Sequence, residues 1–208
     1  MGKNLIVGFT GGIGRATAKA LTESNELVIG FARNIDKAKN YATELNNIEL
    51  IQGDATKIED LEKAIDGVDK LFYCANIPYN KWEKEAVSLF SVSVDLAIKY
   101  NLKLIFPGNV YVYGYAKNNP VNEEHPFHAH TKKGKIRIEM ERKLEEASQK
   151  NNLNYTIVRF PDFYGPYVIN GFSEQIFIKA LKGEKINWFG DLNIPIEFIF
   201  IEDAGKAM

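Results

Sequence analysis

Residues 5–14 read Leu5-Ile6-Val7-Gly8-Phe9-Thr10-Gly11-Gly12-Ile13-Gly14, a short apolar run followed by a glycine-rich turn. An alanine-rich, helix-forming stretch follows, and the apolar residues 27–31 come next. Strand, glycine turn, helix and strand in this order are the context that a dinucleotide-binding turn requires. The glycines let the backbone approach a diphosphate, whose charge is stabilised at the helix N-terminus. We therefore expect cofactor contacts from Gly8, Thr10, Gly11, Gly12, Ile13 and Gly14. A glycine turn without a ligand is the alternative.

The composition is that of an ordinary globular chain. Its 208 residues suit one domain, or one domain with an appendage, and 26 Lys and Arg residues balance 27 Asp and Glu residues. A net charge of -1 gives no electrostatic reason to expect nucleic acid or an anionic membrane as a partner. No apolar run approaches the roughly 20 residues of a membrane-spanning helix. Cys74 is the single cysteine, which excludes an internal disulfide and favours a cytoplasmic location.

The rest of the chain alternates between strand and helix patterns. Apolar runs predict strands over 48–52, 68–74, 102–106, 155–160 and 196–201, and helical spacing predicts helices over 35–45, 81–100 and 139–150. Repeated alternation predicts an α/β fold, a Rossmann-like doubly wound parallel sheet that binds ligands beyond the carboxyl ends of its strands. The irregular segments 114–134 and 161–171 are long for simple connections, and long loops are often functional.

The end of the second predicted strand bears on which dinucleotide is bound. NAD sites commonly carry an acidic residue there, which accepts hydrogen bonds from the ribose hydroxyls. This chain has Phe31-Ala32-Arg33-Asn34, with no carboxylate before Asp36. The Arg33 guanidinium can bind a 2′-phosphate, which favours NADP over NAD. A solvated surface arginine is the alternative.

Several stretches, in the same order along the chain, resemble the extended short-chain dehydrogenase/reductase superfamily in its NAD(P)-dependent epimerase/dehydratase branch. They are the glycine turn, Gly53-Asp54, residues 68–75, Val112-Tyr113-Gly114 and residues 159–166. The resemblance implies that the Asp54 carboxylate contacts the adenine amine. It also implies that the cofactor is lined by Ala55, Cys74, Ala75, Asn76 and Pro161.

The same resemblance implies two parts. Residues 1–160 would form the NAD(P)-binding Rossmann domain, and residues 161–208 a small partial substrate-binding lobe interleaved with the last sheet elements. Extended members of the superfamily continue beyond the helix that residues 202–208 begin. We therefore expect a shortened chain with an incomplete substrate lobe.

The catalytic residues of that family are only partly matched here. In the family a Ser or Thr, a Tyr and, four residues later, a Lys carry the chemistry. Counting back from Val112-Tyr113-Gly114 places Asn109 at the serine position, and the Tyr-x-x-x-Lys motif is absent. Lys135 is in the best register, because Lys135-x-x-x-Glu139 resembles the start of the catalytic helix; its partner is then Thr131. The resemblance implies that Lys135 holds the cofactor ribose and Asn109 positions the substrate oxygen.

The proton donor stays open among Thr131, Tyr111 and His128. A threonine hydroxyl is far less acidic than a phenol, and Tyr111 has packing as an alternative role. The three histidines, His125, His128 and His130, could bind a metal or belong to a polar loop, and we predict no metal site. The basic run 132–135 opposes a helix macrodipole, which an anionic partner such as a cofactor phosphate or a nucleotide-sugar diphosphate would relieve.

These observations predict an NAD(P)-dependent oxidoreductase of the epimerase/dehydratase type, acting on a carbonyl or secondary alcohol of a small molecule such as a nucleotide sugar. A catalytically silent NAD(P)-binding sensor and a structural remnant that binds nothing are the alternatives. The family often dimerises through the helices that here span 81–100 and 135–150, so a homodimer is a further expectation.

Overall fold

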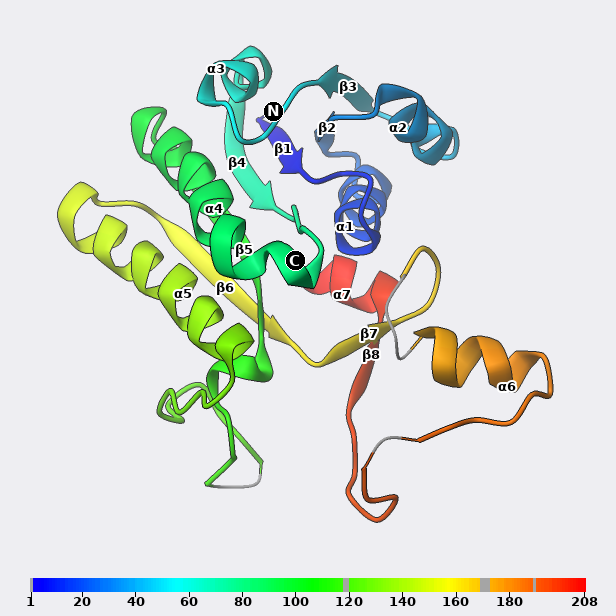
Figure 1. Ribbon diagram of the computed structural model, residues 1–208. Helices are drawn as coiled ribbons and strands as arrows, with labels where there is room; N and C mark the ends of the chain where they lie inside the picture. The colour runs from blue at the N-terminus through cyan, green and yellow to red at the C-terminus, as the bar shows by residue number, and fades with distance from the viewer. Residues whose placement is uncertain (1, 118–119, 169–172, 189) are drawn as a thin grey trace.

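A six-stranded parallel sheet forms the centre of the computed structural model, which describes residues 2–117, 120–168, 173–188 and 190–208 (Figure 1). The strand order is β3-β2-β1-β4-β5-β6, and every neighbouring pair is parallel. This is the order of a dinucleotide-binding doubly wound sheet, so the predicted fold class is confirmed. The strands are β1 (Lys3–Val7), β2 (Leu27–Ala32), β3 (Ile48–Gln52), β4 (Val68–Tyr73), β5 (Lys103–Asn109) and β6 (Tyr155–Phe160).

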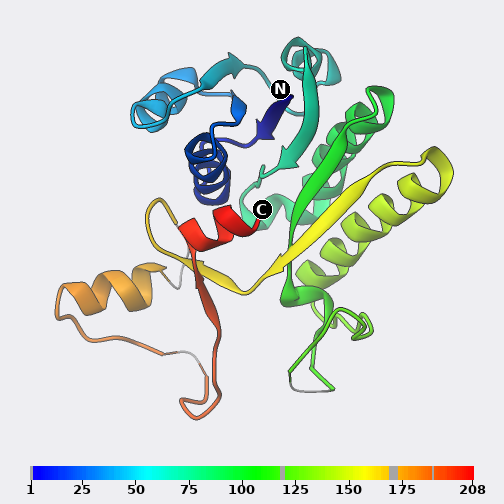
Figure 2. The ribbon, with the colours of Figure 1, turned by 180° about the vertical axis from the view of Figure 1, so that it is seen from behind.

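Helices cover both faces of the sheet (Figures 1 and 2). Side chains alternate along a strand, so Leu5 and Val7 join one core, with α4 and α5, while Ile6 joins the other, with α1 and α2. The helices are α1 (Gly12–Glu23), α2 (Ile35–Ala42), α3 (Ile58–Leu61), α4 (Trp82–Lys99) and α5 (Lys132–Asn151). Short 3₁₀ turns are η1 (Glu62–Ala64), η2 (Tyr79–Lys81) and η3 (Val110–Val112).

Two segments differ from the sequence expectation. Helix α5 begins at Lys132 rather than at Glu139, because the Thr131 side chain caps it by accepting a hydrogen bond from the Gly134 N–H at 3.1 Å. The segment expected to be irregular after Pro161 contains β7 (Asp162–Tyr164), which pairs in parallel with β8 (Phe198–Phe200). Residues 162–164 thus begin a second, two-stranded sheet directly after β6.

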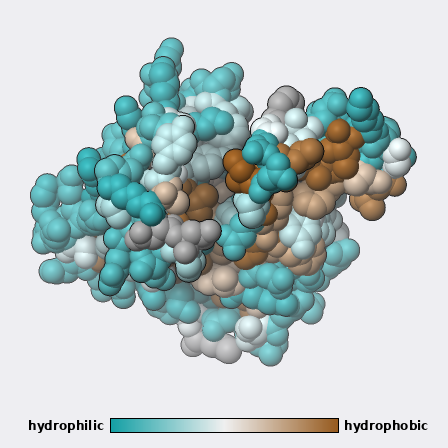
Figure 3. Space-filling model, turned by 90° about the horizontal axis from the view of Figure 1, so that it is seen from below, coloured by the Kyte–Doolittle hydropathy of each residue, from teal (hydrophilic) through white to brown (hydrophobic). Residues whose placement is uncertain are grey.

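The last part of the chain leaves the central sheet and then returns to it. After β7 come the π-helical turn η4 (Ser173–Ile178), the short α6 (Lys179–Leu181), β8 and α7 (Ile201–Ala207). Helix α7 packs on α1 so closely that a Cβ on Gly205 would stand 2.4 Å from the backbone of Ala16. The segment between β7 and β8 protrudes (right in Figure 3) and exposes apolar side chains, Leu181 at 89% and Leu192 at 80%. In the described ranges, no helix is both long and apolar enough to span a bilayer.

Candidate dinucleotide and substrate site

The glycine turn after β1 is closed by contacts that only glycine permits. Gly8 has a φ of +90°, and a Cβ there would lie 2.4 Å from the backbone nitrogen of Ala75. A Cβ on Gly14 would lie 2.4 Å from the carbonyl oxygen of Gly8. The turn therefore folds back on the end of β4 with its backbone exposed to an incoming ligand.

The N-terminus of α1 fits a phosphate group. Its N-cap, Gly11, makes no side-chain capping hydrogen bond, and the first turn holds no acidic residue. The first N–H groups of the helix have no partner within it, so they can donate to an anion, which the helix dipole also favours. Residues 10–13 of this turn face the main cavity of the molecule.

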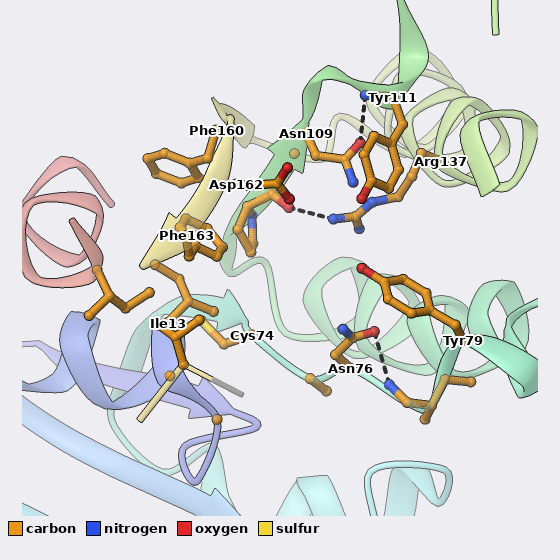
Figure 4. A pocket seen from close by; sticks show the side chains of 18 of the residues that line it. Ile13, Cys74, Asn76, Tyr79, Asn109, Tyr111, Arg137, Phe160, Asp162 and Phe163 are labelled. Carbon is orange, nitrogen blue, oxygen red and sulfur yellow. Dashed lines mark hydrogen bonds between the residues drawn. The ribbon is translucent and has the colours of Figure 1, made fainter. Parts of the chain in front are cut away.

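That cavity, of about 800 Å³, lies beyond the carboxyl ends of β1, β4, β5 and β6 (Figure 4). Its size is in the range of sites for small molecules and cofactors. The polar side chains that line it, away from the glycine turn, include Asn76, Tyr79, Asn109, Tyr111, Lys133, Arg137 and Asp162. The strand-end position predicted for the ligand is thus where the cavity lies.

Asn109 and Tyr111 are fixed by the turn that ends β5. The Asn109 Oδ1 accepts a hydrogen bond from the Tyr111 backbone N–H at 3.1 Å. The Tyr111 hydroxyl points towards the hydroxyl of Tyr79 in Figure 4. Burial, with the neighbouring Tyr79, raises the pKa of Tyr111 above its ordinary value, so the phenol stays protonated.

Helix α5 presents Lys133 and Arg137 to the cavity instead of Lys135. Lys135 is exposed and does not line the cavity. Two residues along a helix correspond to a rotation of roughly 200°, so Lys133 and Lys135 cannot share a face. The lysine of α5 that faces the cavity is therefore Lys133, two residues before the expected Lys135. Lys133 Nζ lies 3.5 Å from the centre of the Tyr79 ring.

Thr131 and His128, two of the three candidate proton donors, also lie outside the cavity lining. The Thr131 hydroxyl is engaged in capping α5. His128 is exposed, as is His130, whose ring stacks on Tyr115. His125 is buried, and its Nε2 accepts a hydrogen bond from the Lys117 N–H at 3.0 Å. Tyr111 is the candidate that the structure brings to the cavity.

The described residues contain no group of three His, Cys, Asp or Glu side chains placed to hold a metal ion. His125 Nδ1 lies 2.9 Å from the Pro126 carbonyl oxygen, which leaves both its ring nitrogens engaged. The His125 ring therefore stabilises its own loop in this structure.

The residues expected along the cofactor divide into two groups. Cys74, Ala75, Asn76 and Pro161 line the cavity. Burial raises the pKa of the Cys74 thiol to about 12, so it is an inert neutral wall residue. Gly8, Gly14, Arg33, Asp54 and Ala55 lie outside its lining.

Arg33 and Asp54 lie near one another at the ends of β2 and β3. Hydrogen bonding from Thr56, aided by the Arg33 charge, lowers the pKa of Asp54, so its carboxylate is ionised near neutral pH. Arg33 is exposed. Lys37 and Tyr41, on α2, line the cavity on this side although the sequence did not single them out.

Asp162 and Arg137 are charged groups in the cavity that sequence reasoning missed. Asp162 is the first residue of β7, and burial raises the pKa of its carboxyl group. Arg137 donates from Nη2 to the Pro107 carbonyl oxygen at 3.1 Å. Two signals pointed to them: Asp162 closely follows a predicted strand, and Arg137 lies three residues before the buried Met140 on the same helix face.

Comparisons with known proteins agree with this geometry. The sequence model of a family described as "NAD dependent epimerase/dehydratase family" matches residues 4–208. A UDP-glucose 4-epimerase of Lactobacillus helveticus is 26% identical over 217 residues, which cover 91% of this chain and 63% of that protein. An uncharacterized protein of Sinorhizobium fredii is 24% identical over 216 residues, covering 98% of this chain and 51% of its own. The chain thus spans about half the length of that relative.

Solved structures show the same fold. A dTDP-glucose 4,6-dehydratase from Bacillus anthracis, in complex with NAD, superposes with a TM-score of 0.85 at 20% identity, covering 100% of this chain and 70% of that one. A UDP-glucose 4-epimerase from Thermotoga maritima, with UDP-glucose, gives a TM-score of 0.82 at 22% identity, covering 99% and 71%.

Proposed function

Because its residues 4–208 match the family model, the chain belongs to the NAD dependent epimerase/dehydratase family, and we propose that it binds NADP or NAD and carries out redox chemistry on a nucleotide sugar. The observation that carries the proposal is the glycine turn at the start of α1, which opens into a cavity lined by Asn109, Tyr111 and Lys133. Residues 1–160 would hold the dinucleotide, and residues 161–208 would border the substrate.

The residues present fit a dinucleotide. Gly8 and Gly14 sit where a Cβ would collide with backbone, and the α1 N-terminus offers unpaired N–H groups to a diphosphate. Asp54 would accept a hydrogen bond from the adenine amine, and Cys74, Ala75, Asn76 and Pro161 would line the nicotinamide side. Lys133, in place of Lys135, would hold the ribose next to the nicotinamide. When bound, the nicotinamide exchanges hydride with a substrate carbon.

The chain's own residues must handle a proton at the substrate oxygen. The Asn109 amide can donate a hydrogen bond to that oxygen, because its Oδ1 is already used by the Tyr111 N–H. The neutral Tyr111 phenol can donate a second hydrogen bond. Asp162 contributes a carboxyl group to the cavity lining, and its carboxylate would accept the proton of a substrate hydroxyl and return it to the carbonyl in the reverse direction.

Coenzyme titration tests the first half of this proposal. Binding of NADPH and NADH is measured by calorimetry with the purified chain, and we expect NADPH to bind more tightly because Arg33 would pair with the 2′-phosphate. Arg33→Ser should lower NADPH affinity by about 10-fold and leave NADH affinity unchanged; the exposed Arg142→Ser is the control. Failure of both coenzymes to bind would contradict the function.

Turnover tests the second half. The chain is incubated with NADP⁺ or NAD⁺ and a series of UDP- and dTDP-linked hexoses, and reduced coenzyme and new sugar products are followed by absorbance and chromatography. An epimerase, a dehydratase or an enzyme that oxidises a sugar hydroxyl gives product with at least one of them. Coenzyme binding without any product favours the silent sensor instead.

A homodimer is part of the proposal. Helices α4 and α5 lie side by side on one face of the sheet (Figure 1), where a second copy could pack against them. Light scattering of the purified chain should give twice the mass of 23.5 kDa. A single-chain mass would contradict the dimer and leave the catalytic proposal untouched.

A further inference from the structure

Arg137 is a cation in the cavity wall that forms no direct ion pair with any carboxylate in the described part of the chain. Among the described residues, no ion pair includes it, and its buried Nε has no hydrogen-bond partner. Glu141, one turn further along α5, is buried and ion-paired with Arg159 instead. Burial of the guanidinium lowers the pKa of Arg137, and the nearby charge of Glu141 opposes this effect without forming a direct ion pair.

The guanidinium is nevertheless held in a fixed place. Its centre lies 5.4 Å from the Trp82 ring and 5.0 Å from the Phe106 ring, and Nη2 donates to the Pro107 carbonyl oxygen. Of the five N–H donors on a guanidinium, one on Nη2 is used by this carbonyl, and Nη1 lies 4.0 Å from the Met140 Sδ, a weak acceptor. Arg137 therefore keeps spare donors on a rigid, positively charged wall of the cavity.

Its position lies near the groups proposed to hold the reacting oxygen. Arg137 reaches the strand end that carries Asn109, through the bond to Pro107, and its charge acts on Tyr111. Lys133 stands one turn earlier on the same face of α5. An anion at Arg137 would therefore belong to the sugar end of the substrate, whereas the cofactor phosphates have the α1 N-terminus.

We propose that Arg137 binds a carboxylate group of the sugar, so that the substrates are nucleotide-linked sugar acids such as hexuronates. This inference rests on the proposed function. A carboxylate matches the planar guanidinium with two parallel hydrogen bonds, and it would give Arg137 the direct ion pair that Glu141, paired with Arg159, does not form. Asp162 also lines the cavity, and like-charge repulsion would turn the sugar carboxylate away from it. The two charged residues together fix the direction in which the sugar enters.

Binding selectivity tests the inference without requiring turnover. The full chain, saturated with whichever coenzyme it binds, is titrated by calorimetry with UDP-glucuronate and UDP-galacturonate, and in parallel with UDP-glucose and UDP-galactose. We expect the acidic sugars to bind about 10- to 100-fold more tightly than the neutral ones, as a charged hydrogen-bonded pair allows.

Substitutions at Arg137 test whether this residue causes the preference for acidic sugars. Arg137→Met should abolish the preference for the acidic sugars, and Arg137→Lys should keep only part of it, because the ammonium lacks the planar fork. Arg142→Met, an exposed change on the same helix, should preserve the preference. Equal affinity for acidic and neutral sugars, or binding of neither, would overturn the inference. Coenzyme binding is measured separately, so a failure of the sugar-acid assignment with coenzyme still bound leaves the proposed function standing.

Discussion

The Asn109 side-chain oxygen and the Tyr111 backbone nitrogen lie 3.1 Å apart, in a hydrogen bond that closes the turn at the end of β5. Because the amide oxygen of Asn109 stabilises this turn, the amide NH₂ is the group that can donate a hydrogen bond to a substrate. One side chain thus serves two separable roles, and two substitutions can separate them.

Asn109→Asp should preserve the fold and reduce turnover. An aspartate keeps the acceptor for the Tyr111 N–H but has no donor for the substrate oxygen, so we expect kcat to fall about 100-fold. Asn109→Ala loses both functions and should also lower the free energy of unfolding by about 1 kcal/mol. Denaturant unfolding and steady-state rates, measured on both variants, check this. Equal turnover in Asn109→Asp and the parent chain would refute the donor role.

Tyr111→Phe should lower kcat by about 10- to 100-fold while leaving the coenzyme Kd unchanged. The raised pKa of Tyr111 keeps the phenol neutral up to its ordinary value of about 10 and beyond, so it acts as a donor and not as a base. The pH-rate profile of the parent chain should accordingly show no Tyr111 ionisation below about pH 10. Tyr115→Phe, an exposed tyrosine outside the cavity, is the matched control.

Thr131→Ala should destabilise the protein by about 1 kcal/mol and leave kcat within about twofold, because the hydroxyl caps α5 and does not face the cavity. Thr131→Ser should restore the stability. A loss of turnover of about 100-fold in Thr131→Ala, with the coenzyme still bound, would instead identify this hydroxyl as part of the proton transfer.

Asp162→Asn should stabilise the folded chain at neutral pH and abolish most turnover. Burial raises the pKa of the Asp162 carboxyl in the folded state, so that state holds the proton more tightly than the unfolded chain does. Its contribution to stability is complete below about pH 4 and is lost as the pH rises through the raised pKa. The Tm of Asp162→Asn should therefore exceed that of the parent chain at pH 7, and the difference should vanish near pH 4.

Asp95→Asn, at an exposed position of α4, is the control for charge removal and should shift neither Tm nor rate. A parent chain that gains stability from pH 4 to pH 7 relative to Asp162→Asn would contradict this account of Asp162.

The sheet could be predicted from local sequence because the apolar side chains of each strand point alternately to the two faces of the sheet. Leu5, Ile6 and Val7 divide between the two cores, and the glycine turn that follows has a conformation open to few other residues. The face of α5 that meets the cavity depends instead on how the helix lies on the sheet. Its buried Met140 and Leu144 define that rotation, and helical spacing back from them leads to Arg137 and Lys133. The resemblance of Lys135-x-x-x-Glu139 to the start of the family's catalytic helix led instead to Lys135, which does not line the cavity.

Other members of the site depend on contacts between distant segments. Tyr79 reaches Tyr111 only because η2 holds it beside the start of α4, and nothing in the residues around position 79 encodes that meeting. Asp162 follows a correctly predicted strand, but its placement in the wall depends on the pairing of β7 with residues near the end of the chain.

The close contact between Gly205 and Ala16 ties the end of the chain to the helix whose first turn faces the glycine loop. The protruding segment between β7 and β8 therefore lies between two parts of the chain that pack on the central domain. Unfolding that extended into α7 would remove a packing partner of α1. Heating should consequently melt the molecule as a single cooperative unit, and a bound dinucleotide would protect residues far beyond those it touches.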